Sequence, residues 1–110
     1  MDPLYYGDYL HLDKLLDAQH LESAKRDRTA HDEMVFIITH QTYELWFKQI
    51  IFELESIIQV FDDPLVHETR MATVLHRLNR VKTIQWVLIQ QIDVIKTCLL
   101  YTSPSPRDRG

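Results

Sequence analysis

Large apolar residues recur every three or four positions through the middle of the chain, from Phe36 to Phe61. This spacing keeps side chains on one face of an α-helix, so it predicts one long helix. The positions of this stripe are Phe36, His40, Tyr43, Phe47, Ile50, Leu54, Ile57 and Phe61. All of them are apolar or aromatic except His40. Further apolar residues lie beyond the stripe, so we expect this helix to need more protein around it than the chain supplies.

A second stripe with the same spacing begins near Glu68 and predicts a helix that reaches Thr97. Its members are Met71, Val74, Leu78, Val81, Leu88, Ile92 and Ile95, and Gln85 interrupts it. The segment Asp62-Asp63-Pro64 lies between the two stripes. It is acidic at the negative end of the first helix, and its proline disfavours helical geometry in the preceding residue. The two long helices are therefore predicted to form an antiparallel pair.

The N-terminal part of the chain has a weaker pattern. From Tyr9 to Gln19, Leu12, Leu15 and Leu16 lie on one side and charged residues on the other, which predicts a short amphipathic helix. Residues 20–30 have no sustained apolar period and are predicted to form a connecting loop. The predicted fold class is all-α, with one short helix followed by two long antiparallel helices and no β-sheet.

The helical pattern stops at Cys98, where the chain continues as CLLYTSPSPRDRG. This string is either an ordinary disordered C-terminus or translated sequencing-adapter read-through, which it resembles. We favour read-through. We therefore predict that residues 1–97 form the N-terminal part of an incomplete helical domain and that residues 98–110 are a non-native or disordered tail. No packed structure is expected from Thr102 onward.

Composition and charge narrow the classes of function. The chain has 110 residues, of which 45% are hydrophobic and 25% charged, as in globular proteins. A net charge of −4 leaves no basic face for nucleic acid. The lone Cys98 excludes an intramolecular disulfide, and no uncharged run approaches the roughly 18 residues of a membrane span. The N-terminus lacks the pattern of a signal peptide, so we expect a cytoplasmic protein with no nucleic-acid or membrane partner.

The six histidines suggest a metal site, but their spacing does not support one. No His-x-x-x-His pair occurs, and neither long helix carries the Glu-x-x-His motif of di-iron bundles. His40 differs because it lies one turn after Phe36 and one turn before Tyr43 on the apolar stripe. A lone histidine there is most often a packed core residue. The alternative is a pocket for a planar aromatic ligand whose N–H donates a hydrogen bond to the imidazole.

Three tyrosines, Tyr5, Tyr6 and Tyr9, precede the first predicted helix. Their rings are too large to be buried against that short segment. They either cover the core of this chain or dock onto another subunit, and sequence physics leaves both possibilities open.

Three segments carry a resemblance to a known family. They read YYGDYLHLDKLLDAQ, HDEMVFIITHQTYELWFKQIIFELESI and LHRLNRVKTIQWVLIQQIDVI, and they follow in order within residues 5–97. Together they closely resemble the N-terminal part of the tryptophan 2,3-dioxygenases, haem enzymes that open the indole ring of L-tryptophan. The resemblance implies haem b as cofactor, L-tryptophan and O2 as substrates, N-formylkynurenine as product and a homotetramer.

The resemblance also implies site residues. His40 matches the family's distal-pocket histidine, which lies on the O2-binding side of the haem and hydrogen-bonds the indole N–H. Phe36 matches the phenylalanine that lines this pocket beside the indole. Tyr6 and Tyr9 match tyrosines that complete the substrate pocket of a neighbouring subunit, which favours docking over coverage of the chain's own core. His40 is thus the catalytic candidate, and all four residues are substrate-binding candidates.

The family's axial haem ligand and the arginine that binds the substrate carboxylate lie beyond the matched segments, so no metal ligand is assigned. A haem without its axial imidazole is not held or tuned for O2 binding, and we expect the isolated chain to be inactive. The alternative is a non-catalytic helical interaction module whose aromatic stripe is a packing seam. Position 40 separates the two, because a seam tolerates leucine there and a substrate pocket does not.

Overall fold

The chain is almost entirely helical where the structure describes it. The computed structural model describes residues 5–25, 30–65 and 68–102. Its helices are α1 (Tyr6–Tyr9), α2 (Leu12–Leu15), α3 (Glu22–Lys25), α4 (Glu33–Asp62) and α5 (Glu68–Thr102). None of the described residues forms a strand, which confirms the predicted all-α fold.

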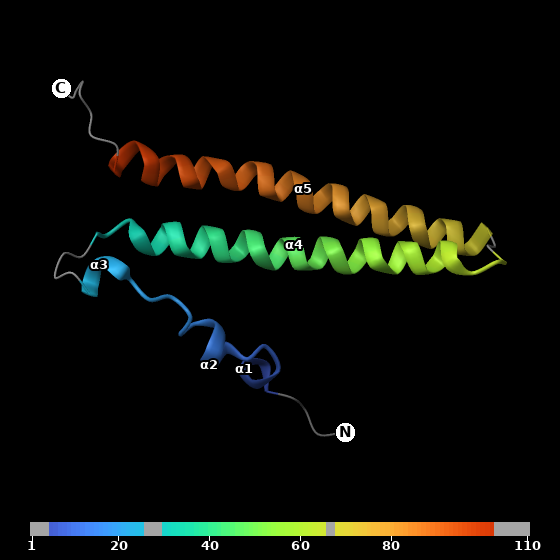
Figure 1. Cartoon of the computed structure of the whole chain (residues 1–110), viewed down its shortest axis with the longest axis horizontal. Coiled ribbons are helices and arrows are strands. Elements are labelled where there is room, and N and C mark those ends of the chain that lie inside the picture. The colour runs from blue at the N-terminus through green and yellow to red at the C-terminus, as the bar shows by residue number, and fades with distance from the viewer. Residues whose placement is uncertain (1–4, 26–29, 66–67, 103–110) are drawn as a thin grey trace.

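Helices α4 and α5 lie side by side and run antiparallel (Figure 1), as predicted. α4 ends at Asp62 because the backbone of Asp63 is extended, with φ −77° and ψ 125°. This is the geometry that a proline favours in the residue before it. The Asp63 carboxylate accepts hydrogen bonds from the Leu65 backbone N–H and from the Arg70 guanidinium. These bonds connect the end of α4 to the beginning of α5.

The seam between α4 and α5 does not coincide with the predicted Phe36–Phe61 stripe. Its buried residues are Thr39, Glu53 and Ile57 on α4 and Val74, Val81, Ile84 and Cys98 on α5. Of the stripe, Ile57 alone is buried, and the other members are half-buried or exposed. Thr39 and Glu53 can be buried in the seam because each is hydrogen-bonded there, and these bonds offset the free-energy cost of burying polar groups.

Glu53 is a buried carboxylate within this seam. It accepts hydrogen bonds from Arg80 Nη1 on α5, at 3.1 Å, and from Gln49 Nε2 on its own helix, at 2.7 Å. The hydrogen bond from Arg80 lowers the pKa of Glu53 below its ordinary value, against the opposing effect of desolvation. Arg80 Nη2 also lies 3.2 Å from His76 Nε2. We call Gln49, Glu53 and Arg80 the Glu53 clamp, because they tie the two long helices together.

The prediction of one helix from Tyr9 to Gln19 is wrong. Two separate turns, α1 and α2, are divided at His11, whose backbone is left-handed with φ 54° and ψ 45°. An α-helix needs negative φ at each residue, so this conformation interrupts it. A third turn, α3, lies within the segment predicted as a loop. The Glu33 carboxylate at the beginning of α4 accepts hydrogen bonds from two backbone N–H groups of α3.

Helix α5 extends beyond the predicted end at Thr97 and reaches Thr102. Cys98 is buried, and its thiol donates a hydrogen bond to the Ile95 carbonyl at 3.1 Å. The predicted boundary at residue 97 is therefore not a break in secondary structure. Residues 103–110 lie outside the described residues, so the expectations for that part of the tail stay predictions.

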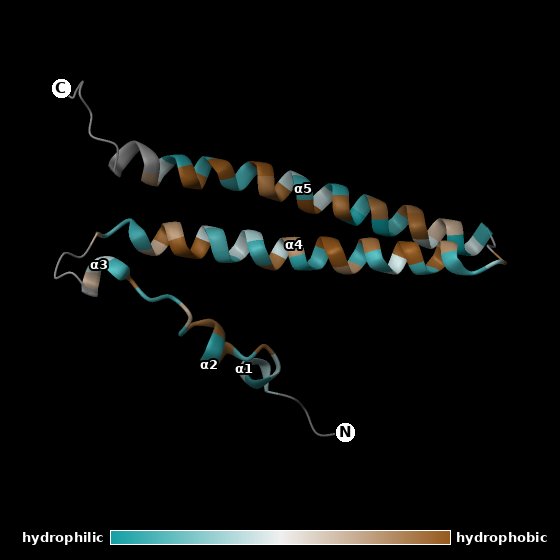
Figure 2. Cartoon of the chain, viewed as in Figure 1, coloured by the Kyte–Doolittle hydropathy of each residue, from teal (hydrophilic) through white to brown (hydrophobic). Residues whose placement is uncertain are grey.

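Hydrophobic residues recur along both long helices (Figure 2), and many of their large side chains are exposed. The exposed fractions are 66% for Phe52 and 59% for Ile58 on α4, and 60% for both Leu75 and Trp86 on α5. The chain therefore supplies too little protein to surround its own helices, as expected from their composition. Within the described ranges, no helix is both long enough and apolar enough to cross a membrane.

Candidate functional site

Phe36 and His40 form a stacked pair in the N-terminal part of α4. Their ring centroids lie 4.2 Å apart with an interplanar angle of 33°, because residues four apart share one helix face. His40 Nδ1 lies 2.7 Å from the Phe36 carbonyl oxygen. A carbonyl oxygen can only accept, so Nδ1 carries the hydrogen, and Nε2 of the neutral ring keeps its lone pair as an acceptor. Both side chains are exposed, outside the α4–α5 seam.

The turn that carries His40 is fixed to α5 by two hydrogen bonds. Thr42 Oγ1 donates to Gln91 Oε1 at 3.0 Å, and the Tyr43 hydroxyl donates to the Leu88 carbonyl oxygen at 2.6 Å. These bonds resist rotation of α4 about its own axis. His40 is therefore held on the outward side of the helix pair.

An open groove of about 470 Å³ lies beside His40, between α4 and the N-terminal segment, by which we mean residues 5–25 with helices α1 to α3. It is lined by Leu15, Ala18, His40, Gln41, Glu44, Leu45 and Lys48. Apolar atoms dominate its surface, and the imidazole of His40 adds a hydrogen-bond acceptor. Such a combination can hold a flat aromatic molecule and recognise an N–H group on its edge.

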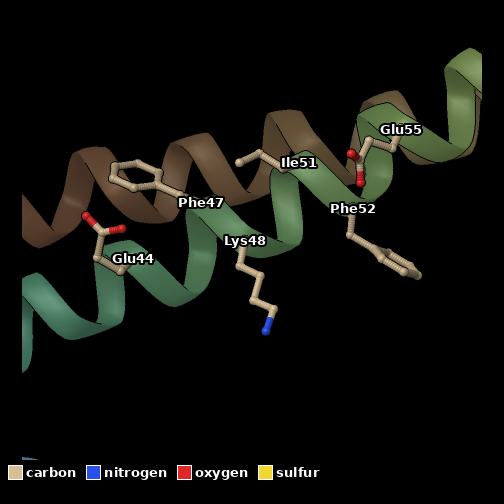
Figure 3. Close-up of a pocket in the computed structure, with 6 residues that line it drawn as sticks. All are labelled: Glu44, Phe47, Lys48, Ile51, Phe52 and Glu55. Atoms are coloured by element: carbon tan, nitrogen blue, oxygen red, sulfur yellow. The ribbon is translucent and has the colours of Figure 1, made fainter.

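A second hollow lies further along α4 (Figure 3). It is lined by Glu44, Phe47, Lys48, Ile51, Phe52 and Glu55, and Figure 3 shows Lys48 and Phe52 extending away from the helix. Its lining contains no imidazole or thiol. Phe47, Ile51 and Phe52 give this hollow a largely apolar surface, which is typical of a packing surface rather than of a reaction site.

The described part of the chain holds no group of three or more His, Cys, Asp or Glu side chains that could bind a metal ion. What it offers near the groove is a single imidazole with an aromatic neighbour. This arrangement suits recognition of a ligand and not the full coordination of a metal.

Comparison with known proteins decides the family. The family model described as tryptophan 2,3-dioxygenase matches residues 1–102. The chain belongs to the tryptophan 2,3-dioxygenase family. It is 50% identical over 95 residues to the tryptophan 2,3-dioxygenase of Bdellovibrio bacteriovorus, which covers 86% of this chain and 26% of that relative. It is 48% identical over 97 residues to the one of Alteromonas mediterranea, which covers 88% and 27%. The chain thus spans about a quarter of the length of these relatives.

The structure brings together two of the four site residues predicted for this tryptophan 2,3-dioxygenase family member. Phe36 and His40 are in contact, and His40 lines the groove. Tyr6 and Tyr9 lie on α1 with 74% and 65% of their surfaces exposed, and neither lines the groove. Their rings therefore do not cover the core of their own chain.

Gln41 also lines the groove, although the sequence pattern does not indicate it. Its side-chain amide hydrogen-bonds Ala18 and Gln19 of the N-terminal segment. The residue directly follows His40 but lies outside the apolar stripe, so periodicity assigns it to solvent. The contact joins residues more than twenty positions apart, and no local pattern in the sequence reports such a contact.

Proposed function

We propose that this chain supplies the distal side of the haem pocket of a tryptophan 2,3-dioxygenase that is a cytoplasmic homotetramer at full length. The reaction adds both atoms of one O2 across the C2–C3 bond of the indole of L-tryptophan, and the product is N-formylkynurenine. The family match over residues 1–102 and the names of the two relatives support this reaction. The residues of this chain bind and orient the indole.

The tautomer of neutral His40, with its hydrogen on Nδ1, is the observation that supports the proposal most directly. Because the Phe36 carbonyl holds the hydrogen on Nδ1, Nε2 can accept a hydrogen bond from the indole N–H without a prior proton shift. The ring of Phe36, stacked on the imidazole, provides an apolar face for the indole. The indole N–H is a very weak acid, so His40 acts as a hydrogen-bond acceptor and not as a base that removes the proton.

Haem b is the cofactor that this family implies, and the groove beside His40 fits one side of it. The groove has a largely apolar surface with the His40 imidazole in its lining, and Phe36 stacks against that imidazole. This combination suits the open face of a haem. When bound, the haem supplies the oxygen chemistry. With a haem bound, His40 and Phe36 would line its distal side, orient the indole and exclude water. The axial ligand and the carboxylate-binding arginine are proposed to belong to the portion of the relatives that this chain does not match.

Tyr6 and Tyr9 are proposed to complete the substrate pocket of a neighbouring subunit in the homotetramer. Their exposed rings support this role, because large aromatic side chains left uncovered are typical of protein interfaces. The proposal also accounts for their absence from the lining of the groove of their own chain.

The experiment that tests the function uses a chimera. The matched residues of this chain replace the corresponding segment of the Bdellovibrio bacteriovorus enzyme, which is 50% identical there. The parent chimera and its His40→Ala variant are compared on L-tryptophan and on N1-methyltryptophan, which has no indole N–H. His40→Ala removes one hydrogen bond, which is worth about 0.5–1.5 kcal/mol. The ratio of kcat/KM for L-tryptophan to kcat/KM for N1-methyltryptophan is therefore expected to fall about three- to tenfold relative to the parent chimera.

Gln85→Ala is the matched control, because this exposed residue lies on α5 away from the groove. It is expected to keep the parent's preference, which also corrects for the bulk of the methyl group. Equal preference in His40→Ala and the parent would show that His40 is not the partner of the indole.

The exposed apolar face of α4 favours a second candidate, a non-catalytic helical interaction module. In that case position 40 belongs to a packing surface. His40→Leu is then expected to leave the oligomeric state of the chimera unchanged. It should also lower the rate of L-tryptophan turnover no more than the Gln85→Ala control does.

A further inference from the structure

Gln41 joins α4 to the N-terminal segment through both ends of its side-chain amide. Its Nε2 donates to the Ala18 carbonyl oxygen at 2.8 Å, and its Oε1 accepts a hydrogen bond from Gln19 Nε2, also at 2.8 Å. Gln19 Nε2 donates in addition to the Leu15 carbonyl oxygen at 3.0 Å. One side chain therefore binds two consecutive residues in a stretch without regular secondary structure.

This attachment lies directly beside the proposed substrate site. Gln41 follows His40 in α4, and both line the groove, while Leu15 and Ala18 form its other wall. That wall belongs to α2 and the residues after it, and α2 is a single turn of four residues. Such a short helix is marginal by itself. The position of the wall relative to His40 therefore depends on the bonds that Gln41 makes.

A second attachment holds the N-terminal segment further along the chain. The Glu33 carboxylate accepts hydrogen bonds from the backbone N–H groups of α3 and from the Ser23 hydroxyl. Figure 1 shows the segment close to α4 at α3 and diverging from it towards α1. Glu33 lies about two helical turns before Gln41, so it fixes α3 and leaves α2 to be held at Gln41.

We propose that Gln41 is a positioning residue for the substrate site, because its amide holds the Leu15–Ala18 wall against the turn of α4 that carries His40. The role of Gln41 in substrate binding rests on the proposed function, whereas its attachment of the N-terminal segment to α4 does not. Position 41 needs both a donor and an acceptor. A glutamate there loses the donor to Ala18 and sets a carboxylate against a carbonyl oxygen.

Hydrogen exchange on the 110-residue chain tests the attachment. Backbone N–H groups of Lys14, Leu15 and Leu16 are hydrogen-bonded within the α2 turn, so opening of this turn governs their exchange. Gln41→Glu and Gln41→Ala are expected to speed exchange of residues 12–20 about two- to tenfold. Exchange within α5 is expected to stay at the parent's rate.

Gln59→Ala is the matched control, because Gln59 is an exposed glutamine on the same helix. It is expected to leave the exchange of residues 12–20 unchanged. Equal exchange in Gln41→Ala and Gln59→Ala would overturn the proposal. Absence of protection of residues 12–20 in the parent would overturn it as well.

A double variant separates this attachment from a general loss of helix stability. Gln19→Ala is expected to speed exchange in the same residues, because it removes the donor to Gln41 Oε1. Adding Gln41→Ala should then have less effect than it has alone, since both changes break one shared contact. If the increase in exchange rate in the double variant equals the product of the increases in the two single variants, the side-chain amides of Gln19 and Gln41 do not pair with each other.

The chimera separates positioning from catalysis. Gln41→Ala is expected to raise KM for L-tryptophan about two- to tenfold and to keep kcat within about twofold, because the wall moves while His40 stays on α4. A fall in kcat at constant KM would overturn the positioning role. A parent chimera that forms no N-formylkynurenine contradicts the proposed function, and the exchange measurements then still decide the attachment.

Discussion

The hydrogen of His40 is placed by a carbonyl one turn earlier in its own helix. Phe36 contributes twice, with its backbone oxygen at 2.7 Å and with its ring at a centroid distance of 4.2 Å. Periodicity placed both residues on one face, and the family resemblance implied their roles. Neither periodicity nor the resemblance predicts the tautomer, because the tautomer depends on how closely Nδ1 approaches one particular oxygen.

We expect neutral His40 to carry its hydrogen on Nδ1. In a chain labelled with 15N at histidine, the chemical shifts and couplings of the two ring nitrogens distinguish the tautomers. The exposed His20, which lies outside any helix, provides a reference for a solvated ring in the same spectrum. A hydrogen on Nε2 of His40 would contradict the structure and remove the acceptor that the proposed function requires.

At the level of the elements, periodicity predicts the α4–α5 pair and not the seam between its helices. Thr39 and Glu53 are buried there, although a count of apolar positions assigns them to solvent. Each is stabilised by a specific hydrogen bond, to the Phe36 carbonyl for Thr39 and from Arg80 for Glu53. Such pairings depend on how the helices meet, so the sequence of one helix does not reveal them.

The break between α1 and α2 has a similar explanation. His11 adopts a left-handed backbone, which histidine tolerates better than most residues. Unlike a glycine, however, a histidine in a sequence does not indicate that conformation. Apolar spacing continues across it, from Leu10 to Leu12 and Leu15. The pattern therefore predicts one helix where the backbone forms two turns.

The Glu53 clamp predicts a dependence of stability on pH. The folded-state pKa of Glu53 lies below its ordinary value of 4.5. The ionised carboxylate therefore stabilises the fold at pH values above 4.5, and this contribution is lost as the pH falls through the lowered pKa. Glu53→Gln should lower the free energy of unfolding at pH 7 by about 1 kcal/mol, a value kept small because Arg80 is half exposed.

Urea unfolding followed by helical circular dichroism measures this effect between pH 3 and pH 7. The difference between the parent and Glu53→Gln should shrink as the pH decreases. Glu55→Gln, at an exposed position of α4, is the matched control and should leave unfolding nearly unchanged. A difference between parent and Glu53→Gln that is constant over this range would contradict the role of the ionised carboxylate.

At the level of the whole molecule, the chain is more extended than an independent domain of its length. Its radius of gyration is 20.2 Å, whereas about 13 Å is typical of a compact domain of this size. Many large apolar side chains stay exposed along the helix pair. Both observations agree with a chain that spans about a quarter of the length of its relatives.

We expect the isolated 110-residue chain to be inactive. It should form no N-formylkynurenine from L-tryptophan and O2, and added haem should not give the absorption spectrum of a stoichiometric imidazole complex. The physical reason is that the described residues offer no group of metal ligands and only one side of a pocket. The parent chimera is the positive control, and turnover by the isolated chain would contradict the expectation.

The antiparallel arrangement of α4 and α5 also has a consequence for the order of folding. The two helices are consecutive in the chain and are joined by residues 63–67, so their pairing closes a short loop. Contacts between sequence neighbours form quickly, because little chain entropy is lost in bringing them together. During synthesis, the hairpin that presents His40 can therefore assemble as soon as α5 leaves the ribosome, and later parts of a longer polypeptide would meet a preformed surface.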